Sequence, residues 1–281
     1  MQGKVVVITG ATSGIGQVAA EKLAAMGARM VLVARDQARG EAALARLKQI
    51  APDAAHNIHY ADLSRVGEMK RVAAGIAQSE PRVDVLINNA GAIFNTRQVT
   101  EDGLELTFAT NHMSYFVMTH GLRERLAASA PARIVNTSSR AHRRARIDFN
   151  DLQSARDYNG FMVYSRSKLL NILFTRELAR RLSGTGVTAN ALHPGFVASR
   201  FGNQSGGWFS FAIRFWQNFA ITPEEGAETI VYLASSPEVA DVTGKYFYKC
   251  RAASPTSAAQ DDSAAARLWA ETAKLAGIVS W

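Results

Sequence analysis

Residues 4–16 read Lys-Val-Val-Val-Ile-Thr-Gly-Ala-Thr-Ser-Gly-Ile-Gly, a β-branched run followed by a glycine-rich turn. Residues 4–9 predict a strand, and residues 14–26 predict a helix. A turn of this kind leaves free N–H groups at the helix N-terminus, where a pyrophosphate binds. A P-loop is excluded because no Gly-Lys-Ser/Thr follows. The expected phosphate contacts are Gly10, Thr12, Ser13, Gly14, Ile15 and Gly16.

The same alternation of strand and helix continues along the chain. Further strands are predicted at 29–34, 56–60, 83–88, 132–137, 187–192 and 245–248. The intervening helices are predicted at 36–50, 64–79, 106–126 and 161–182, then from a capping box at 222–225, and finally at 264–275. This order implies an α/β protein with a doubly wound parallel sheet, the Rossmann fold.

Neither a linker nor an internal repeat divides the chain, so residues 1–281 are expected to form a single domain. The aromatic segment 206–220 departs from the α/β rhythm and is interpreted as a helical insertion. Residues 254–281 are interpreted as a C-terminal extension.

Composition points to a soluble globular protein, with 47% hydrophobic and 20% charged residues. No transmembrane run or signal peptide is predicted, so the expected location is cytoplasmic. Cys250 is the only cysteine, which excludes an intrachain disulfide and a cysteine metal cluster. The six histidines show no ligand spacing, and we predict no metal site.

The net charge of +8 is densest around four arginines and His142: Arg140, Arg143, Arg144 and Arg146. No aromatic residues are interleaved and no recognition helix is visible, so a nucleic-acid partner is not expected. A solvated basic loop, or contact with a cofactor phosphate, an acidic substrate or an anionic membrane surface, explains the charge instead.

The second predicted strand ends in Ala34-Arg35-Asp36. An acidic residue at the strand tip would bind the adenosine ribose of NAD, whereas an arginine pairs with the 2′-phosphate of NADP. Ala34 removes the acid and Arg35 supplies the cation, while Asp36 is interpreted as a helix N-cap. The sequence therefore favours NADP, with NAD possible.

Tyr164 and Lys168 are four residues apart on a predicted helix, so both project from one face. An ammonium beside a phenol favours the phenolate and is expected to lower its pKa toward the range useful for proton transfer. Alone this pattern is weak, but the glycine turn strengthens it.

Together these residues resemble the short-chain dehydrogenase/reductase family over essentially the whole chain. The resemblance extends to motifs that occur in the family's order: Asp62-Leu63, Asn88-Asn89-Ala90-Gly91, Asn111 in Thr-Asn-His, Ser138-Ser139, and Pro194-Gly195. Two stretches look most like the retinol dehydrogenase branch of the family. They are Asn136-Thr-Ser-Ser139, and the stretch from residues 178–182 to His193-Pro-Gly195.

The resemblance implies a catalytic tetrad. Tyr164 would be the general acid/base, Lys168 would hold the cofactor ribose, Ser139 would polarise the carbonyl, and Asn111 would hold a relay water. Ser138 competes with Ser139, and the alternative for Asn111 is a purely structural role.

The resemblance also implies cofactor contacts. Asp62 and Leu63 would contact adenine, although Asp62 is also a plausible helix cap. The remaining expected contacts are Asn89, Ala90, Gly91, Pro194, Gly195 and Val197.

These features predict an NADP-dependent oxidoreductase that interconverts an alcohol and an aldehyde or ketone on a small apolar substrate. The alternative is a non-catalytic NADP-binding regulatory or scaffold protein. The segment 208–219 is interpreted as a substrate lid, a cover for the core or dimer contact, or a shallow membrane contact. The resemblance allows a homo-oligomer.

Overall fold

The computed structural model describes residues 1–195 and 221–279. Eight strands form one sheet in the order β3-β2-β1-β4-β5-β6-β7-β8, and every neighbouring pair is parallel except β7–β8. The strands are β1 (Val5–Thr9), β2 (Arg29–Ala34), β3 (Asn57–Tyr60), β4 (Val85–Asn88), β5 (Ala132–Thr137), β6 (Val187–Leu192), β7 (Tyr246–Tyr248) and β8 (Arg251–Ala253).

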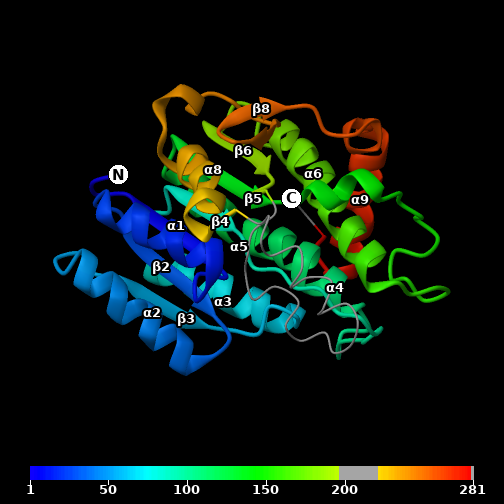
Figure 1. Ribbon diagram of the computed structural model, residues 1–281, viewed down its shortest axis with the longest axis horizontal. Coiled ribbons are helices and arrows are strands. Elements are labelled where there is room, and N and C mark those ends of the chain that lie inside the picture. Colours follow the sequence, from blue (N-terminus) through cyan, green and yellow to red (C-terminus); the bar gives the residue numbers. More distant parts are fainter. Residues whose placement is uncertain (196–220, 280–281) are drawn as a thin grey trace.

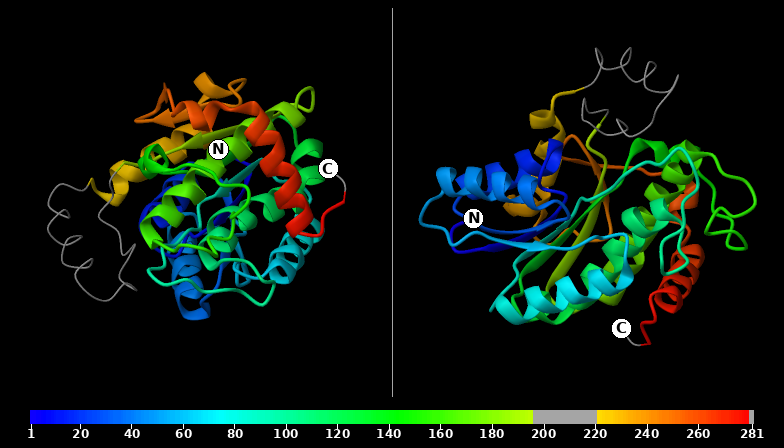
Figure 2. Two further views of the ribbon diagram at one scale, coloured as in Figure 1. Left: turned by 90° about the vertical axis from the view of Figure 1, so that its right-hand side faces the viewer. Right: turned by 90° about the horizontal axis from the view of Figure 1, so that it is seen from below.

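Helices cover both faces of this sheet, which confirms the doubly wound α/β prediction (Figures 1 and 2). One layer contains α1 (Gly14–Ala25), α2 (Gln37–Ile50) and α8 (Pro223–Ser235). The other layer contains α3 (Val66–Ser79), α5 (Ser114–Ala128), α6 (Gly160–Arg181) and α9 (Asp262–Leu275).

Each layer buries its own hydrophobic core against the sheet. Val6 and Ile8 of β1 face the α1/α8 side, whereas Val5 and Val7 face the α3/α5/α6 side. A central strand that is apolar on both faces is what a sheet covered twice requires. The β-branched run at the N-terminus therefore fixes β1 at the centre of the sheet.

The chain crosses to the other side of β1 after β3, because β4 pairs with the opposite edge of β1 from β2. This reversal is a topological switch point, where the carboxyl ends of the strands leave a crevice suited to a ligand.

The predicted helix 106–126 is interrupted. It begins as a short α4 (Leu106–Phe108), continues as the π-helical turn η1 (Ala109–Met113), and becomes regular only at α5. Hydrophobic periodicity could not predict this, because a single π-turn changes the register of the helix without ending it.

Strand β8 was also missed. It forms a two-residue hairpin with β7, and the turn residues Lys249 and Cys250 have φ values of +48° and +57°. Turns of this kind favour Asn-Gly, so Lys-Cys gave no hairpin signal.

Helix α9 of the C-terminal extension packs on α6. Trp269 contacts both Phe116 of α5 and Phe174 of α6, with ring centroids 4.9 and 5.7 Å away. The predicted insertion 206–220 lies outside the described residues. No helix within 1–195 or 221–279 is both long and apolar enough to cross a membrane.

Candidate active site

The end of β1 is tied to the end of β4 by hydrogen bonds from backbone to side chain. Thr9 Oγ1 accepts the N–H groups of Asn89 and Ala90, both at 3.0 Å. Asn89 Nδ2 donates to the carbonyls of Thr9 at 3.3 Å and Gly10 at 3.1 Å. Asn89, predicted as a cofactor contact, is therefore placed where it holds the glycine turn.

Glycine is required in this turn because backbones approach closely. Gly10 has a φ of +71°, and a Cβ there would lie 2.8 Å from Ala90 Cα. At Gly16 a Cβ would overlap the carbonyl oxygen of Gly10 and Nδ2 of Asn89. These two glycines pack the first helix against the sheet, which is one function of such a turn.

The N-terminus of α1 fits a phosphate group. The N-cap residue Ser13 makes no side-chain cap, and no acidic residue lies in the first turn. The N–H groups of Gly14, Ile15 and Gly16 are therefore left for an anion, in the favourable field of the helix dipole. Thr12 and Ser13 flank them at the surface.

At the tip of β2, the structure confirms the predicted capping role of Asp36. Asp36 caps α2, with its Oδ1 accepting the Arg39 N–H at 2.8 Å. Arg35 is exposed, and within the described parts of the chain its guanidinium has no hydrogen bond or ion pair. The cation is thus available to a ligand, whereas the nearby carboxylate is already bonded.

Asp62 lies at the end of β3, where one carboxylate oxygen caps the following turn. Its Oδ1 accepts from Ser64 N at 3.0 Å and Ser64 Oγ at 2.9 Å. Helix α3 itself starts later and is capped by Asp102, which accepts the Val66 N–H at 2.8 Å. Asp62 therefore caps this turn, and its contact with adenine stays a prediction; its neighbour Leu63 is buried in the core.

Tyr164 lies in the second turn of α6, and the Ser139 side chain interacts with its hydroxyl in the direction that lowers the pKa of the phenol. The two serines after β5 differ clearly. Ser138 is buried and donates its hydroxyl to the Lys168 carbonyl at 2.7 Å, whereas Ser139 is partly exposed. This geometry favours Ser139 over Ser138 as the partner of Tyr164.

Lys168 is buried among neutral groups, with 2% of its surface exposed. Its Nζ donates to the Thr137 carbonyl at 3.2 Å. The ring centroids of Tyr164 and Tyr115 lie 5.6 and 5.7 Å from Nζ, within the range of cation–π attraction. The same carbonyl also accepts from Asn171 Nδ2 at 3.3 Å.

The acid–base properties differ from the sequence-based expectation. Burial raises the pKa of Tyr164 to about 12, while its hydrogen bond with Ser139 acts in the opposite direction. Burial also lowers the pKa of Lys168 to about 7. The expected lowering of the Tyr164 pKa by Lys168 is therefore wrong. Burial raises the pKa of the phenol, and the same burial disfavours the charged form of Lys168 that would have lowered it.

Asn111 is fully buried in the π-helical turn, and its side chain has three protein partners. Its Oδ1 accepts from Ala92 N at 2.7 Å, and its Nδ2 donates to Ala92 O at 2.8 Å and Ser167 Oγ at 3.0 Å. The side chain therefore clamps the segment after β4 to α6. The relay water stays a prediction: both Nδ2 hydrogens are bonded within the protein, so a water could only donate to Oδ1.

The other predicted residues line the same edge of the sheet. At Gly91 a Cβ would lie 3.3 Å from both Lys168 Nζ and Asn111 Oδ1, so the small residue keeps space beside the amine. Pro194 and Gly195 follow β6. Val197 lies outside the described residues.

Sequence reasoning missed the Thr137 carbonyl, Asn171 and Tyr115, which together surround Lys168. The spacing from Lys168 to Asn171 is one helical turn, and this could have indicated a shared face. A backbone carbonyl gives no sequence signal.

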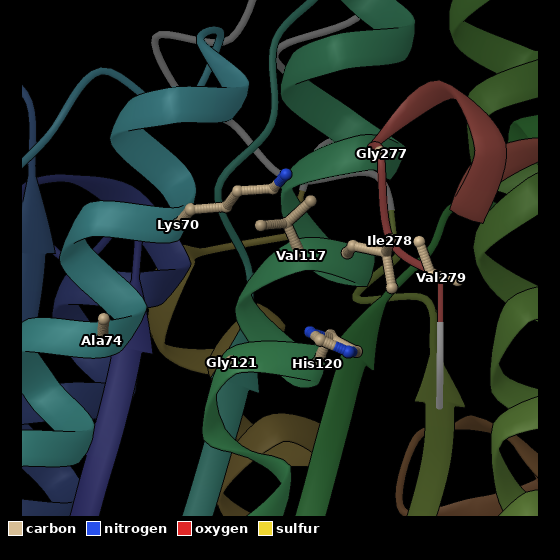
Figure 3. Close-up of a pocket in the computed structure, with 8 residues that line it drawn as sticks. All are labelled: Lys70, Ala74, Val117, His120, Gly121, Gly277, Ile278 and Val279. Carbon is tan, nitrogen blue, oxygen red and sulfur yellow. The ribbon is translucent and has the colours of Figure 1, made fainter.

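A separate hollow of about 360 Å³ lies between α3, α5 and the segment after α9 (Figure 3). It shares no residue with the set around Tyr164, and we do not assign it to the reaction. Its lining residues are Lys70, Ala74, Val117, His120, Gly121, Gly277, Ile278 and Val279. Among the described residues no cluster of His, Cys, Asp or Glu could hold a metal ion.

Buried neutral histidines should make the protein sensitive to acid. Burial lowers the pKa of His112 and of His193 to about 4, and it also lowers the pKa of His56, His59 and His142. Between about pH 6.5 and 4 the unfolded chain binds protons that the folded chain does not. For His112 and His193, the free energy of unfolding should therefore fall by up to ~1.4 kcal/mol per group for each unit that the pH drops through this range.

Urea denaturation at pH 7.5, 6.0 and 5.0 measures this effect, with His112→Gln as the comparison. The variant should show a shallower fall than the wild type. Equal slopes would show that His112 does not contribute.

Comparison with known proteins agrees with this geometry. The family model for short chain dehydrogenases matches residues 4–208. Retinol dehydrogenase 14 of Mus musculus is 42% identical, over 99% of this chain and 87% of the relative. The solved structure of an uncharacterised Mycobacterium paratuberculosis protein has a TM-score of 0.79 and 32% identity, covering 99% of this chain and 94% of that one. The Pseudomonas aeruginosa RhlG/NADP active-site complex has a TM-score of 0.70 and 26% identity, covering 88% and 94% respectively.

The chain belongs to the short-chain dehydrogenase family. It is an oxidoreductase of alcohol and carbonyl groups with a nicotinamide dinucleotide site. Within that family it is retinol dehydrogenase-like, as the sequence motifs indicated.

Proposed function

We propose that this protein is an NADP-dependent reductase of apolar aldehydes or ketones. The observation that carries the proposal is the grouping of Tyr164 with its side-chain partner Ser139 and a buried Lys168, whose Nζ lies 5.6 Å from the Tyr164 ring centroid, at the carboxyl edge of the sheet. The free helix N-terminus near Gly14 and the exposed Arg35 on the same sheet fit a dinucleotide phosphate.

A bound NADPH would supply the hydride. The chain's own residues supply the rest: Ser139 would hydrogen-bond the carbonyl oxygen, and Tyr164 would donate a proton to it. A pKa near 12 keeps Tyr164 a protonated phenol at neutral pH, which is the state that a proton donor needs. The direction of the shift therefore supports reduction.

A preference for NADP is supported by the arrangement at the end of β2, where Arg35 is available and Asp36 is already bonded. The RhlG complex, which contains NADP, adds support from a relative.

Arg35→Ala should weaken NADPH binding by about 10- to 100-fold, since a hydrogen bond from a charged donor contributes ~1.5–3 kcal/mol. NADH binding should change by less than about threefold. Fluorescence titration of both cofactors measures this. The matched control is Arg39→Ala, which removes a cation one turn further along α2. Equal losses for NADPH and NADH in the Arg35 variant would contradict the assignment.

An apolar substrate is proposed from the aromatic segment 208–219 and from the names of the curated relatives, which are retinol dehydrogenases. The test is to incubate the protein with NADPH and all-trans-retinal, nonanal, or a steroid ketone, and to follow loss of absorbance at the NADPH band. Oxidation of NADPH with one of these supports a reductase. Tight NADPH binding without turnover of any carbonyl would favour the regulatory alternative.

A further inference from the structure

We propose that His142 is a positioning residue that fixes Ser139 for its contact with the substrate carbonyl. This inference rests on the proposed reductase function. His142 lies outside the family tetrad that the sequence suggested, yet it is the side chain that holds the backbone of the reacting serine.

Two donors of His142 converge on one carbonyl. The His142 backbone N–H donates to the Ser139 carbonyl at 3.1 Å, and the imidazole Nδ1 lies 2.7 Å from the same oxygen. Ser139 is the N-cap of the short helix η2 (Arg140–Arg144), and its Oγ accepts the Ala141 N–H at 3.2 Å. The orientation of the Ser139 hydroxyl is therefore set by a loop that His142 fastens from inside.

The tautomer of His142 follows from its acceptor. A carbonyl oxygen only accepts, so His142 must carry its proton on Nδ1. The Tyr246 hydroxyl, 3.4 Å from that nitrogen, cannot donate to it, and it pairs with His193 Nδ1 at 2.7 Å. His193 stacks on the rings of Tyr246 and Tyr248, with centroids 5.3 and 4.1 Å away.

This cluster connects the two loops that flank the reaction. His142 holds the serine loop after β5, while His193 directly precedes Pro194 and Gly195 after β6. His142 is fully buried, and its Nε2 has no partner among the described residues. Burying an imidazole with one unsatisfied nitrogen costs free energy. We therefore infer that His142 occupies this position because its Nδ1 donates to the Ser139 carbonyl.

The imidazole stays neutral in this position. Burial lowers the pKa of His142, the nearby Arg143 acts in the same direction, and the bond to the Ser139 carbonyl opposes them. The neutral form has one donor and one acceptor, so the clamp keeps a single tautomer at working pH.

A double-mutant cycle on the full chain tests the proposal. His142→Leu should lower kcat with NADPH and the fastest aldehyde among retinal and nonanal by about 10- to 100-fold, in line with the effect of small misplacements. KM for NADPH should change by less than about threefold, because the clamp does not touch the phosphate site. His142→Asn, whose Nδ2 can replace the imidazole Nδ1 as a donor, should recover most of the loss.

The cycle separates positioning from general damage. In a Ser139→Ala background, His142→Leu should lower kcat by less than about threefold, since a residue that acts through Ser139 has nothing left to position. An equal loss in both backgrounds would overturn the proposal. If Ser139→Ala itself leaves kcat intact, the reductase mechanism fails instead.

Nitrogen-15 NMR of labelled histidines gives a readout that needs no substrate. We expect the His142 signal, assigned by its loss in His142→Asn, to show a protonated Nδ1 and an unprotonated Nε2 between pH 6.5 and 8. The opposite tautomer would break the bond to Ser139 and overturn the proposal.

Discussion

Tyr164→Phe should lower kcat for carbonyl reduction by about 10³-fold or more, because it removes the proton donor and leaves the ring in place. The dissociation constant of NADPH should change by less than about threefold. Steady-state kinetics and a fluorescence titration of NADPH measure the two quantities.

Tyr158→Phe is a matched control, because burial raises the pKa of Tyr158 to about 12 as well. The single hydrogen of its hydroxyl lies within hydrogen-bond distance of two acceptors, the Phe94 carbonyl at 3.0 Å and Glu105 Oε1 at 3.2 Å. Removing these bonds should destabilise the fold by ~1–3 kcal/mol and leave kcat within about threefold. Similar kcat losses in both variants would show that Tyr164 is only structural.

Lys168→Met should lower kcat/KM by about 10³-fold, since one change removes both the amine that we propose holds the cofactor ribose and the polar group beside the Tyr164 phenol. The free energy of unfolding at pH 7 should stay equal or rise. Burial lowers the pKa of this amine from 10.5 to about 7, so the folded state disfavours the ammonium that the unfolded chain carries.

The free energy of unfolding should also depend on pH through Lys168. Between about pH 7 and 10.5 the unfolded wild type binds a proton that the folded protein lacks, so the wild type should gain stability as pH rises. The variant should lack this gain. The Thr137 carbonyl keeps Asn171 and Tyr115 as donors, so the substitution leaves no unpaired oxygen. A large loss of stability at pH 7 would contradict this account.

The fold and the location of the site could be predicted from the sequence because their signals are local. Residues 4–9 and the glycines after them predicted the central strand and its turn. The later motifs lie at strand ends or on adjoining helices, and the sheet brings them to one edge. Asp36 as a helix cap was predicted in the same way.

The electrostatics could not be predicted in the same way, because they depend on burial. Spacing placed Lys168 next to Tyr164, but only the packing shows that the amine is surrounded by rings and carbonyls. The role of Asn111 depends on the π-turn and on contacts with Ala92 and Ser167, which lie 19 and 56 residues away. The hydrogen bond from His142 to Ser139 could not be predicted either, because residues 140–146 show only a basic composition in the sequence.

The most direct test is isotope transfer. The wild type, incubated with deuterium-labelled NADPH and the aldehyde that it reduces fastest, should yield an alcohol with one deuterium on the carbinol carbon, detected by mass spectrometry. Tyr164→Phe, saturated with the same cofactor, should yield almost none. A wild-type protein that binds the labelled cofactor tightly but transfers no deuterium to any carbonyl would contradict the account.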